Sequence, residues 1–304
     1  MSSAPPHIAV PADASRLPVT LPLLHEKKLL SEPIVMVTAY DFPSARAAEA
    51  AGVDIVLVGD SGAMTVLGYP STVPVSTDEL LMLARAVRRG LRTPFLVGDL
   101  PFGSYEVSDE QAVQTAMRFV KEAGCDAVKL ERGNSTSVAR ARAIVQAGIP
   151  VMGHIGLTPQ TSTALGGYRA QGRSTEAAVR IAHEALALQD AGCFSLVFEA
   201  IPAALAAELM PRIAVPVIGI GAGPATDGQV LVFHDLLGIR EGRGARFVQR
   251  YADLQAEMNA GVAAYASDVR ERRYPRPEHS YTIDDAELGR VRAHLQAEAA
   301  PIDG

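Results

Sequence analysis

The sequence contains few cysteines, few aromatic residues and no excess of positive charge. Its 304 residues include two cysteines and no tryptophan, and the formal net charge is −6. Nucleic-acid-binding proteins usually carry a basic patch, so this acidic chain is not expected to bind nucleic acid. Two cysteines could form one disulfide, but their placement, described below, favours buried thiols in a reducing, cytoplasmic protein.

Long apolar runs are also missing. No stretch approaches the roughly 20 residues that a membrane helix needs, and Met1 to Val10 lack the charged and apolar segments of a secretory signal. We therefore expect no membrane partner. Hydrophobic residues make up 48% and charged residues 20%, which is enough for a sizeable core. Residues 1–16 show no periodicity and predict a frayed arm.

From Pro33 onward, short apolar runs alternate with alanine-rich helical stretches. Most runs are rich in Val, Ile and Leu without alternation, which is typical of strands buried on both faces. Eight such runs are predicted as strands: Ile34–Tyr40, Asp54–Asp60, Phe95–Leu100, Ala127–Glu131, Val151–Gly156, Ser195–Ala200, Val215–Gly223 and Val230–Asp235.

Ala-Gly pairs end four of the predicted helices, at Gly52, Gly124, Gly148 and Gly192, and each pair shortly precedes a strand. Such alternation predicts parallel strands with helical crossovers. No G-x-G-x-x-G motif opens the first helix, which disfavours a dinucleotide-binding sheet. We predict an α/β fold with a single (β/α)₈ TIM-type barrel over residues 17–275. No helix is evident between strands seven and eight, so the pattern is compatible with about one strand more or fewer than eight.

The C-terminal part is predicted to be helical. Residues 252–267 and 284–298 have helical patterns, separated by a proline-containing turn. Residues 276–304 are predicted as a helical tail that caps the barrel or contacts another subunit, not as a second catalytic domain.

Ionisable residues mark the ends of five successive predicted strands. In such barrels the active site forms at the carboxyl ends of the strands. Each residue also has a structural interpretation: an aspartate can cap a helix, Lys129 and Glu131 can form an ion pair, and His154 can be a hydrogen-bonded core residue. Their coincidence at one rim favours a functional site. The strand-end residues are Asp60, Asp99, Glu131, His154 and Glu199, with Lys129 two residues before Glu131.

These residue types indicate a hard cation. Carboxylates without a Cys/His cluster favour Mg²⁺, which takes one or two protein carboxylates with water and substrate oxygens. Cys125 and Cys193 each follow a helix-ending glycine and precede a strand, which places them at the opposite end of the barrel.

Two glycine-rich segments each have two interpretations. Residues 219–223, after the seventh strand, either bind phosphate or allow a close backbone approach. Residues 166–173, after the fifth strand, form either a mobile loop over the site or an ordinary surface loop.

Several motifs together resemble the ketopantoate hydroxymethyltransferase family over roughly residues 18–275. They are Thr38-Ala39-Tyr40-Asp41, Val58-Gly59-Asp60-Ser61, Gly98-Asp99-Leu100-Pro101-Phe102, Val128-Lys129-Leu130-Glu131, Gly153-His154-Ile155-Gly156-Leu157-Thr158-Pro159-Gln160, Gly166-Gly167-Tyr168, Phe198-Glu199-Ala200, Gly219-Ile220-Gly221-Ala222-Gly223, and residues 227–232 with His234-Asp235. Their number and order make the resemblance specific.

The resemblance implies a one-carbon transferase on a barrel of the phosphoenolpyruvate/2-oxo-acid type. It would move a hydroxymethyl group from 5,10-methylenetetrahydrofolate to 3-methyl-2-oxobutanoate, giving 2-dehydropantoate for pantothenate biosynthesis. It also implies a homo-oligomer, commonly a decamer. By similarity, Asp60 and Asp99 would bind Mg²⁺ with Glu131 nearby through water; Asp60, Ser61, Asp99 and Lys129, together with His154, would bind the oxo acid; and Glu199 would be the catalytic base.

The sequence departs from the family pattern at two places beside the metal site. Gly62-Ala63-Met64 replaces the usual Leu-Gly-Met, and Arg132-Gly133 replaces Gly-Gly. Apolar neighbours on both sides of Glu199 are expected to make its carboxylate more basic. Two alternatives remain: a Mg²⁺-dependent 2-oxo-acid lyase or mutase of the isocitrate lyase/phosphoenolpyruvate mutase type, and a non-catalytic barrel.

Overall fold

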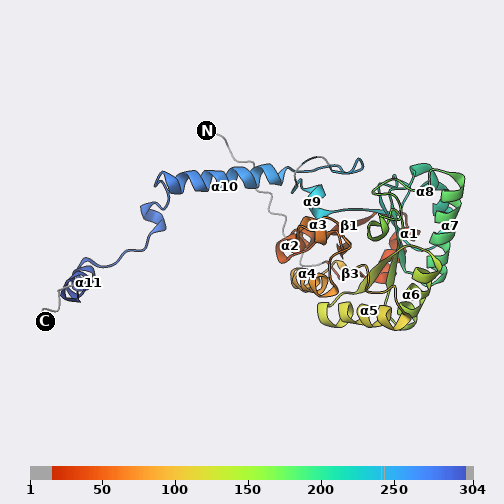
Figure 1. Cartoon of the computed structure of the whole chain (residues 1–304), viewed down its shortest axis with the longest axis horizontal. Coiled ribbons are helices and arrows are strands. Elements are labelled where there is room, and N and C mark those ends of the chain that lie inside the picture. The colour runs from red at the N-terminus through yellow and green to blue at the C-terminus, as the bar shows by residue number, and fades with distance from the viewer. Residues whose placement is uncertain (1–15, 241, 243, 299–304) are drawn as a thin grey trace. The chain divides into compact units, whose positions relative to one another are not determined.

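The computed structural model describes residues 16–240, 242 and 244–298, and its central feature is a closed barrel of eight parallel strands (Figure 1). The strands are paired in chain order, and the last strand pairs with the first. The predicted (β/α)₈ architecture is therefore confirmed. The strands are β1 (Ile34–Thr38), β2 (Ile55–Val58), β3 (Phe95–Asp99), β4 (Ala127–Glu131), β5 (Val151–Gly156), β6 (Ser195–Glu199), β7 (Val217–Ile220) and β8 (Gly228–Leu231).

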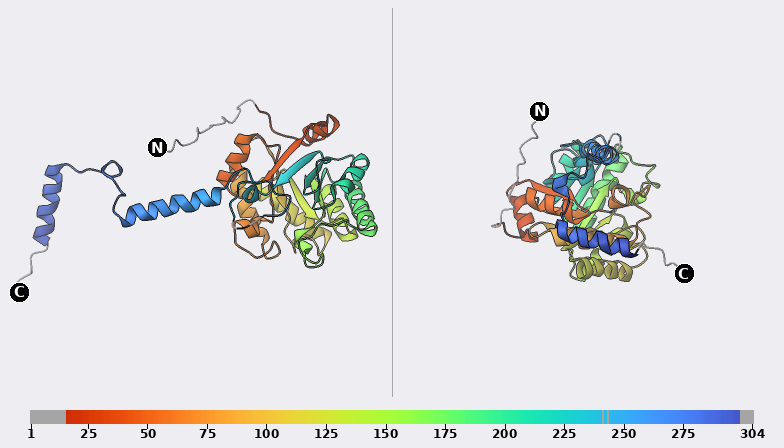
Figure 2. Two further views of the ribbon diagram at one scale, coloured as in Figure 1. Left: turned by 90° about the horizontal axis from the view of Figure 1, so that it is seen from above. Right: turned by 90° about the vertical axis from the view of Figure 1, so that its left-hand side faces the viewer.

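Helices surround the strands, and α4 to α7 are seen on the outside of the barrel in Figures 1 and 2. Serine side chains cap the amino ends of α4, α5 and α7, and left-handed Gly52 and Gly124 end α2 and α5. The helical elements are α1 (Leu21–Leu29), α2 (Phe42–Ala51), α3 (Gly62–Thr65), α4 (Thr77–Gly90), α5 (Asp109–Ala123), α6 (Ser135–Gln146), η1 (Pro159–Thr161), α7 (Thr175–Asp190), α8 (Ala203–Leu209), η2 (Met210–Arg212) and α9 (Phe233–Leu236).

The strands bury side chains on both faces, which explains their continuous apolar sequences. Leu96, Leu130 and Phe198 belong to the larger core that includes the surrounding helices. Val97 and Val197, one residue away on the same strands, belong to the smaller core inside the barrel. Leu24 of α1 joins this inner core, so α1 closes the end of the barrel at which the strands begin.

The eighth strand was predicted too far along the chain. The prediction was Val230–Asp235, but β8 covers Gly228–Leu231, and Phe233–Leu236 form the short helix α9. A Cβ on Gly228 would lie 2.3 Å from the carbonyl oxygen of Ile34. Glycine is thus required where β8 meets β1, and an apolar-run criterion does not recognise a strand that begins with glycine and glutamine. The predicted lack of a helix between β7 and β8 is confirmed.

Residues from Asp253 onward form a separate unit. This unit contains α10 (Leu254–Arg270), η3 (Pro277–His279) and α11 (Asp285–Glu298), and none of these helices has a buried residue. The predicted helices are present, while the proposed boundary at residue 275 stays a prediction. No helix in the described ranges has the length and apolar character needed to span a membrane.

The predicted N-terminal arm, residues 1–16, lies outside the described residues except for Arg16. The Arg16 guanidinium lies 3.3 Å from the carboxylate of Asp54, which precedes β2.

Both cysteines are free and buried, as predicted, in the turns that lead from α5 into β4 and from α7 into β6. Burial raises the pKa of each thiol to about 12, so neither Cys125 nor Cys193 is an activated nucleophile.

We predict that the double variant Cys125→Ser/Cys193→Ser keeps the wild-type catalytic rate but unfolds more easily. Each new hydroxyl is buried in an apolar environment, at a cost of about 1–3 kcal/mol if it finds no partner. Thermal unfolding and steady-state kinetics measure the two effects separately. A lost catalytic rate in a fully folded double variant would refute the structural role.

Candidate active site

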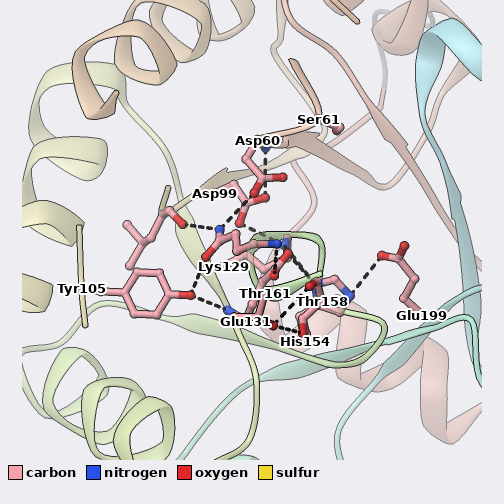
Figure 3. A network of polar contacts seen from close by, with 12 residues as sticks. Asp60, Ser61, Asp99, Tyr105, Lys129, Glu131, His154, Thr158, Thr161 and Glu199 are labelled. Atoms are coloured by element: carbon pink, nitrogen blue, oxygen red, sulfur yellow. Dashed lines mark hydrogen bonds and ion pairs between the residues drawn. The ribbon is translucent and has the colours of Figure 1, made fainter. Parts of the chain in front are cut away.

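The side chains predicted to form the site come together at the carboxyl ends of the strands. A cavity of ≈ 160 Å³ is lined by all seven of them and by apolar residues of β2, β6, β7 and β8. Six belong to the polar network of Figure 3, while Ser61 lies to one side of it. The seven residues are Asp60, Ser61, Asp99, Lys129, Glu131, His154 and Glu199.

Strand alternation directs these side chains inward. Lys129 and Glu131 are two residues apart on β4, so they share the interior face, while Leu130 between them packs in the outer core. On β6, Glu199 follows Val197 of the inner core. The apolar strand sequences therefore supply the outer core, and their last inward positions supply the charged groups.

Lys129 lies at the centre of the network. Its Nζ is 3.0 Å from Oδ1 of Asp99, 3.3 Å from Nδ1 of His154 and 4.0 Å from Oε1 of Glu131. Burial disfavours the ammonium, but the neighbouring carboxylates, Asp99 foremost, outweigh burial and raise the pKa of Lys129. Lys129 is therefore a permanent positive charge in the cavity.

The carboxylates of Asp60 and Asp99 are both buried, and they lie close enough for their negative charges to repel each other. Burial and the charges of Asp99 and Glu131 raise the pKa of Asp60 well above its usual range. Burial also raises the pKa of Asp99, although Lys129 opposes this shift. The raised pKa values show that the cavity favours an additional positive charge.

His154 connects the network to Glu199. Its Nδ1 lies 3.4 Å from Oε1 of Glu131, and its Nε2 lies 3.1 Å from Oε2 of Glu199. The second distance is that of an ion pair, although Nε2 is not oriented for a hydrogen bond. Burial and Lys129 oppose protonation, but the two glutamates outweigh them and raise the pKa of His154 to about 9. The two glutamates therefore favour the protonated form of His154.

Gln160 is a member of the site that the sequence analysis quoted in a motif but gave no role. Its Nε2 donates to Oδ2 of Asp60 at 3.0 Å, and its backbone N–H donates to Oε2 of Glu131 at 3.0 Å. The hydroxyl of Tyr105 donates to Oε1 of Gln160 at 2.7 Å. Only the position of Gln160 after the His154 strand hinted at this role, because an amide residue alone is a weak signal.

The two departures from the family pattern lie beside the cavity without removing a charge. Gly62 lets the Tyr40 ring approach the α3 backbone, since a Cβ there would lie 2.7 Å from the ring. The Tyr40 hydroxyl in turn lies 2.8 Å from Oγ of Ser61. Arg132 has a left-handed φ of 71°, a conformation that suits the glycine usual at this position.

The donor atoms fit a hard cation. Oδ1 of Asp99 and Oε1 of Glu131 are buried and, within the described part of the chain, meet only the ion-pair contacts of Lys129 and His154, with no oriented hydrogen bond. In the same part, no three His, Cys, Asp or Glu side chains are grouped to hold an ion alone. A metal that takes one or two carboxylates, with water and substrate oxygens completing its coordination, matches this arrangement.

The glycine-rich segments also lie at this end of the barrel. A Cβ on Gly221 would lie 2.6 Å from the Phe247 ring, which supports the close-approach interpretation of residues 219–223. In the segment 166–173, the Tyr168 hydroxyl lies 3.9 Å from Sδ of Met64. Because Met64 follows β2 and Tyr168 follows β5, this segment extends over the carboxyl end of the barrel. Its mobility stays a prediction.

Known proteins that are similar in sequence to this chain belong to one family. A family model described as ketopantoate hydroxymethyltransferase matches residues 18–277. The chain is 48% identical over 284 residues to 3-methyl-2-oxobutanoate hydroxymethyltransferase 1, mitochondrial, of Arabidopsis thaliana, which covers 91% of this chain and 82% of the relative. It is 52% identical to 3-methyl-2-oxobutanoate hydroxymethyltransferase of Acidothermus cellulolyticus, over 86% of this chain and 96% of the relative.

Solved structures show the same type of barrel. The crystal structure of phosphoenolpyruvate phosphomutase from Streptomyces platensis subsp. rosaceus matches with a TM-score of 0.54 and 15% sequence identity, over 90% of this chain and 96% of that chain. This similarity confirms the predicted fold type.

We predict that Gln160→Leu weakens Mg²⁺ binding about 10–100-fold, the usual range when a residue that orients metal ligands is replaced. The change removes the amide that holds Asp60, while the exposed Gln114→Leu is a matched control. Calorimetric titration measures the affinity. Tyr105→Phe should act in the same direction but less, because it removes a hydroxyl that contacts Gln160 and the backbone N–H of Glu131 but no metal-binding carboxylate. Unchanged Mg²⁺ affinity in folded Gln160→Leu would rule out this positioning role.

Proposed function

The chain belongs to the ketopantoate hydroxymethyltransferase family, and we propose that it transfers a hydroxymethyl group from 5,10-methylenetetrahydrofolate to 3-methyl-2-oxobutanoate. The product would be 2-dehydropantoate, a precursor of pantothenate. The observation that carries this proposal is the single cavity lined by the metal-binding, cationic and basic side chains that the family resemblance assigns.

The cavity suits a small oxo acid. Its volume of ≈ 160 Å³ fits a small substrate. Lys129 would pair with the substrate carboxylate, since its ammonium is buried and fixed by Asp99. Ser61 and His154, which also line the cavity, would complete the binding of the oxo acid.

Mg²⁺ would be held by Asp60 and Asp99, with Glu131 acting from further away through water. When bound, Mg²⁺ supplies Lewis-acid stabilisation of negative charge on the substrate oxygens. Gln160 would fix the carboxylates of Asp60 and Glu131 by its two hydrogen bonds, so that the ligands are oriented before the metal binds.

Glu199 would remove the proton from carbon 3 of the oxo acid. Its side chain is 15% exposed, whereas that of His154 is 3% exposed, so Glu199 has more room to meet a substrate. The apolar sequence neighbours do not act on Glu199 as expected, because Phe198 and Ile201 pack in the outer core and do not surround the carboxylate. His154 would instead orient Glu199 through the 3.1 Å contact. His154 is the rival base, but both of its ring nitrogens already face glutamate oxygens.

The alternative lyase or mutase activity has less support. The solved barrels of that type share only the fold at this level of identity. The lyases use a cysteine-bearing loop at the site, and Cys125 and Cys193 are buried at the other end of the strands. A non-catalytic barrel is disfavoured because Asp60, Asp99 and Glu199 are all retained.

We also propose a homo-oligomer, a decamer by family resemblance. Val35, on the outer face of β1, is 51% exposed and lines an apolar groove of ≈ 470 Å³ outside the barrel. Separately, Met258, Val262, Tyr265 and Val269 are exposed at helical spacing along α10. Subunit contacts would bury such surfaces. The cytoplasmic location stays a prediction; the Arabidopsis relative is named as mitochondrial.

The metal prediction tests the proposed function directly. Purified protein with Mg²⁺, 3-methyl-2-oxobutanoate and 5,10-methylenetetrahydrofolate should form 2-dehydropantoate, measured by mass spectrometry. Asp60→Ala and Asp99→Ala should abolish turnover while circular dichroism shows an intact fold, because each removes a metal ligand. Full activity of the wild-type protein in excess chelator would exclude the metal dependence.

The role of Glu199 can be tested without folate. The wild-type protein should exchange the carbon-3 hydrogen of 3-methyl-2-oxobutanoate with D₂O, as followed by proton NMR. Glu199→Gln keeps the shape of the side chain and should slow exchange about 10²–10⁴-fold, the usual contribution of a general base. His154→Gln should slow exchange less. Normal exchange by Glu199→Gln together with none by His154→Gln would identify His154 as the base.

A further inference from the structure

We propose that a second pocket, next to the catalytic cavity, binds the aromatic and glutamate parts of the folate co-substrate. This inference rests on the proposed function and assigns residues to a ligand that neither the sequence motifs nor the polar network of the cavity places. The pocket has a volume of ≈ 580 Å³, and Arg173, Ile201, Pro202, Arg246 and Phe247 contribute to its lining.

The pocket and the cavity share one rim. Glu199 and Ile220, the last residues of β6 and β7, line the cavity, and the residues that follow them, Ala200 and Gly221, line the pocket. Phe247 lines both spaces and packs over Gly221, where a Cβ would lie 2.6 Å from its ring. A ligand in the pocket can therefore present one end beside Glu199.

The volumes separate the two substrates. The ≈ 160 Å³ of the cavity matches a small oxo acid, whereas ligands of the size of a folate occupy pockets of roughly 300–1,000 Å³. The ≈ 580 Å³ of the neighbouring pocket falls in that range. Transfer of a one-carbon unit requires the two substrates to meet, and the common rim is the place where they would do so.

The lining matches the chemistry of a folate. Ile201, Pro202 and Phe247 offer apolar surface to planar rings. Arg173 and Arg246 are exposed, and neither forms an ion pair with another described residue. Guanidinium groups bind carboxylates through paired hydrogen bonds, so these two arginines fit the glutamate part of a folate.

The backbone adopts an unusual conformation at Ala200, where the catalytic cavity meets the second pocket. Ala200 has a left-handed φ of 47°, which is unfavourable for alanine, and its N–H donates to the carbonyl of Ile220 at 2.8 Å. Its own carbonyl accepts a hydrogen bond from the N–H of Gln171 at 2.9 Å. Glu199 is thereby directed into the barrel, while Ile201 and Pro202 continue along the wall of the pocket.

The experiment measures binding without turnover. Tetrahydrofolate and tetrahydropteroate, which lacks the glutamate, are titrated by calorimetry into the wild-type protein, Arg173→Ala/Arg246→Ala and the control Arg89→Ala, with Mg²⁺ and oxo acid present. Arg89 is an exposed arginine of α4, outside the pocket. Wild type and Arg89→Ala should bind tetrahydrofolate about tenfold more tightly than tetrahydropteroate, as expected for two charge-assisted contacts at an exposed rim. The double variant should bind both ligands with the same weaker affinity.

Tetrahydrofolate affinity that is unchanged in the folded double variant would overturn the pocket assignment, and so would equal binding of the two ligands by the wild-type protein. These outcomes leave the proposed function intact if the wild-type protein still forms 2-dehydropantoate. Conversely, glutamate-dependent binding by a protein that forms no 2-dehydropantoate would refute the proposed function and support the pocket. The affinity difference of the wild-type protein should shrink at high salt, whereas the double variant should bind the two ligands equally at every salt concentration, as expected for carboxylate–arginine contacts.

Discussion

Burial of several carboxylates around one cavity is the constraint on which the site depends. Such groups are costly in a low-dielectric interior unless positive charges compensate them. Lys129 provides this compensation by its contacts with Asp99 and Glu131, and His154 extends it to Glu199. The remaining imbalance, seen in the raised pKa values of Asp60 and Asp99, favours an additional positive charge beside these carboxylates.

The barrel makes this accumulation of charge possible because it separates two environments along each strand. Residues at the starts of the strands, such as Ile55 and Phe95, form an apolar interior together with Leu24 of α1. The charged groups occupy only the last inward positions, where the cavity begins. The apolar layer below them excludes water from one side, and the hydrogen bonds of Gln160 fix the carboxylates from the other.

Much of the fold and of the site could be predicted from the sequence, for specific reasons. β4 and β5 coincide with the predicted runs because they are continuous apolar segments, and Asp99, Glu131 and Glu199 could be grouped because parallel strands end on one side. The contacts of Gln160 could not be predicted, because they depend on how η1 folds back over β4. The environment of Glu199 depends on which residues of other strands lie on its face of β6, because its own sequence neighbours point to the opposite face.

The direct link from β7 to β8 has a consequence for the dynamics of the barrel. Register pairs join these strands only at Ile218–Gly228 and Gly219–Gln229, and no crossover helix lies between them in the chain. Local opening starts where backbone pairing and apolar cover are least. Local opening of the barrel is therefore expected between β7 and β8. These strands lead to Ile220 and Gly221, which line the cavity and the neighbouring pocket, respectively. A ligand that binds only when β7 and β8 are paired would stabilise the closed barrel, so ligand binding and barrel closure would be thermodynamically linked.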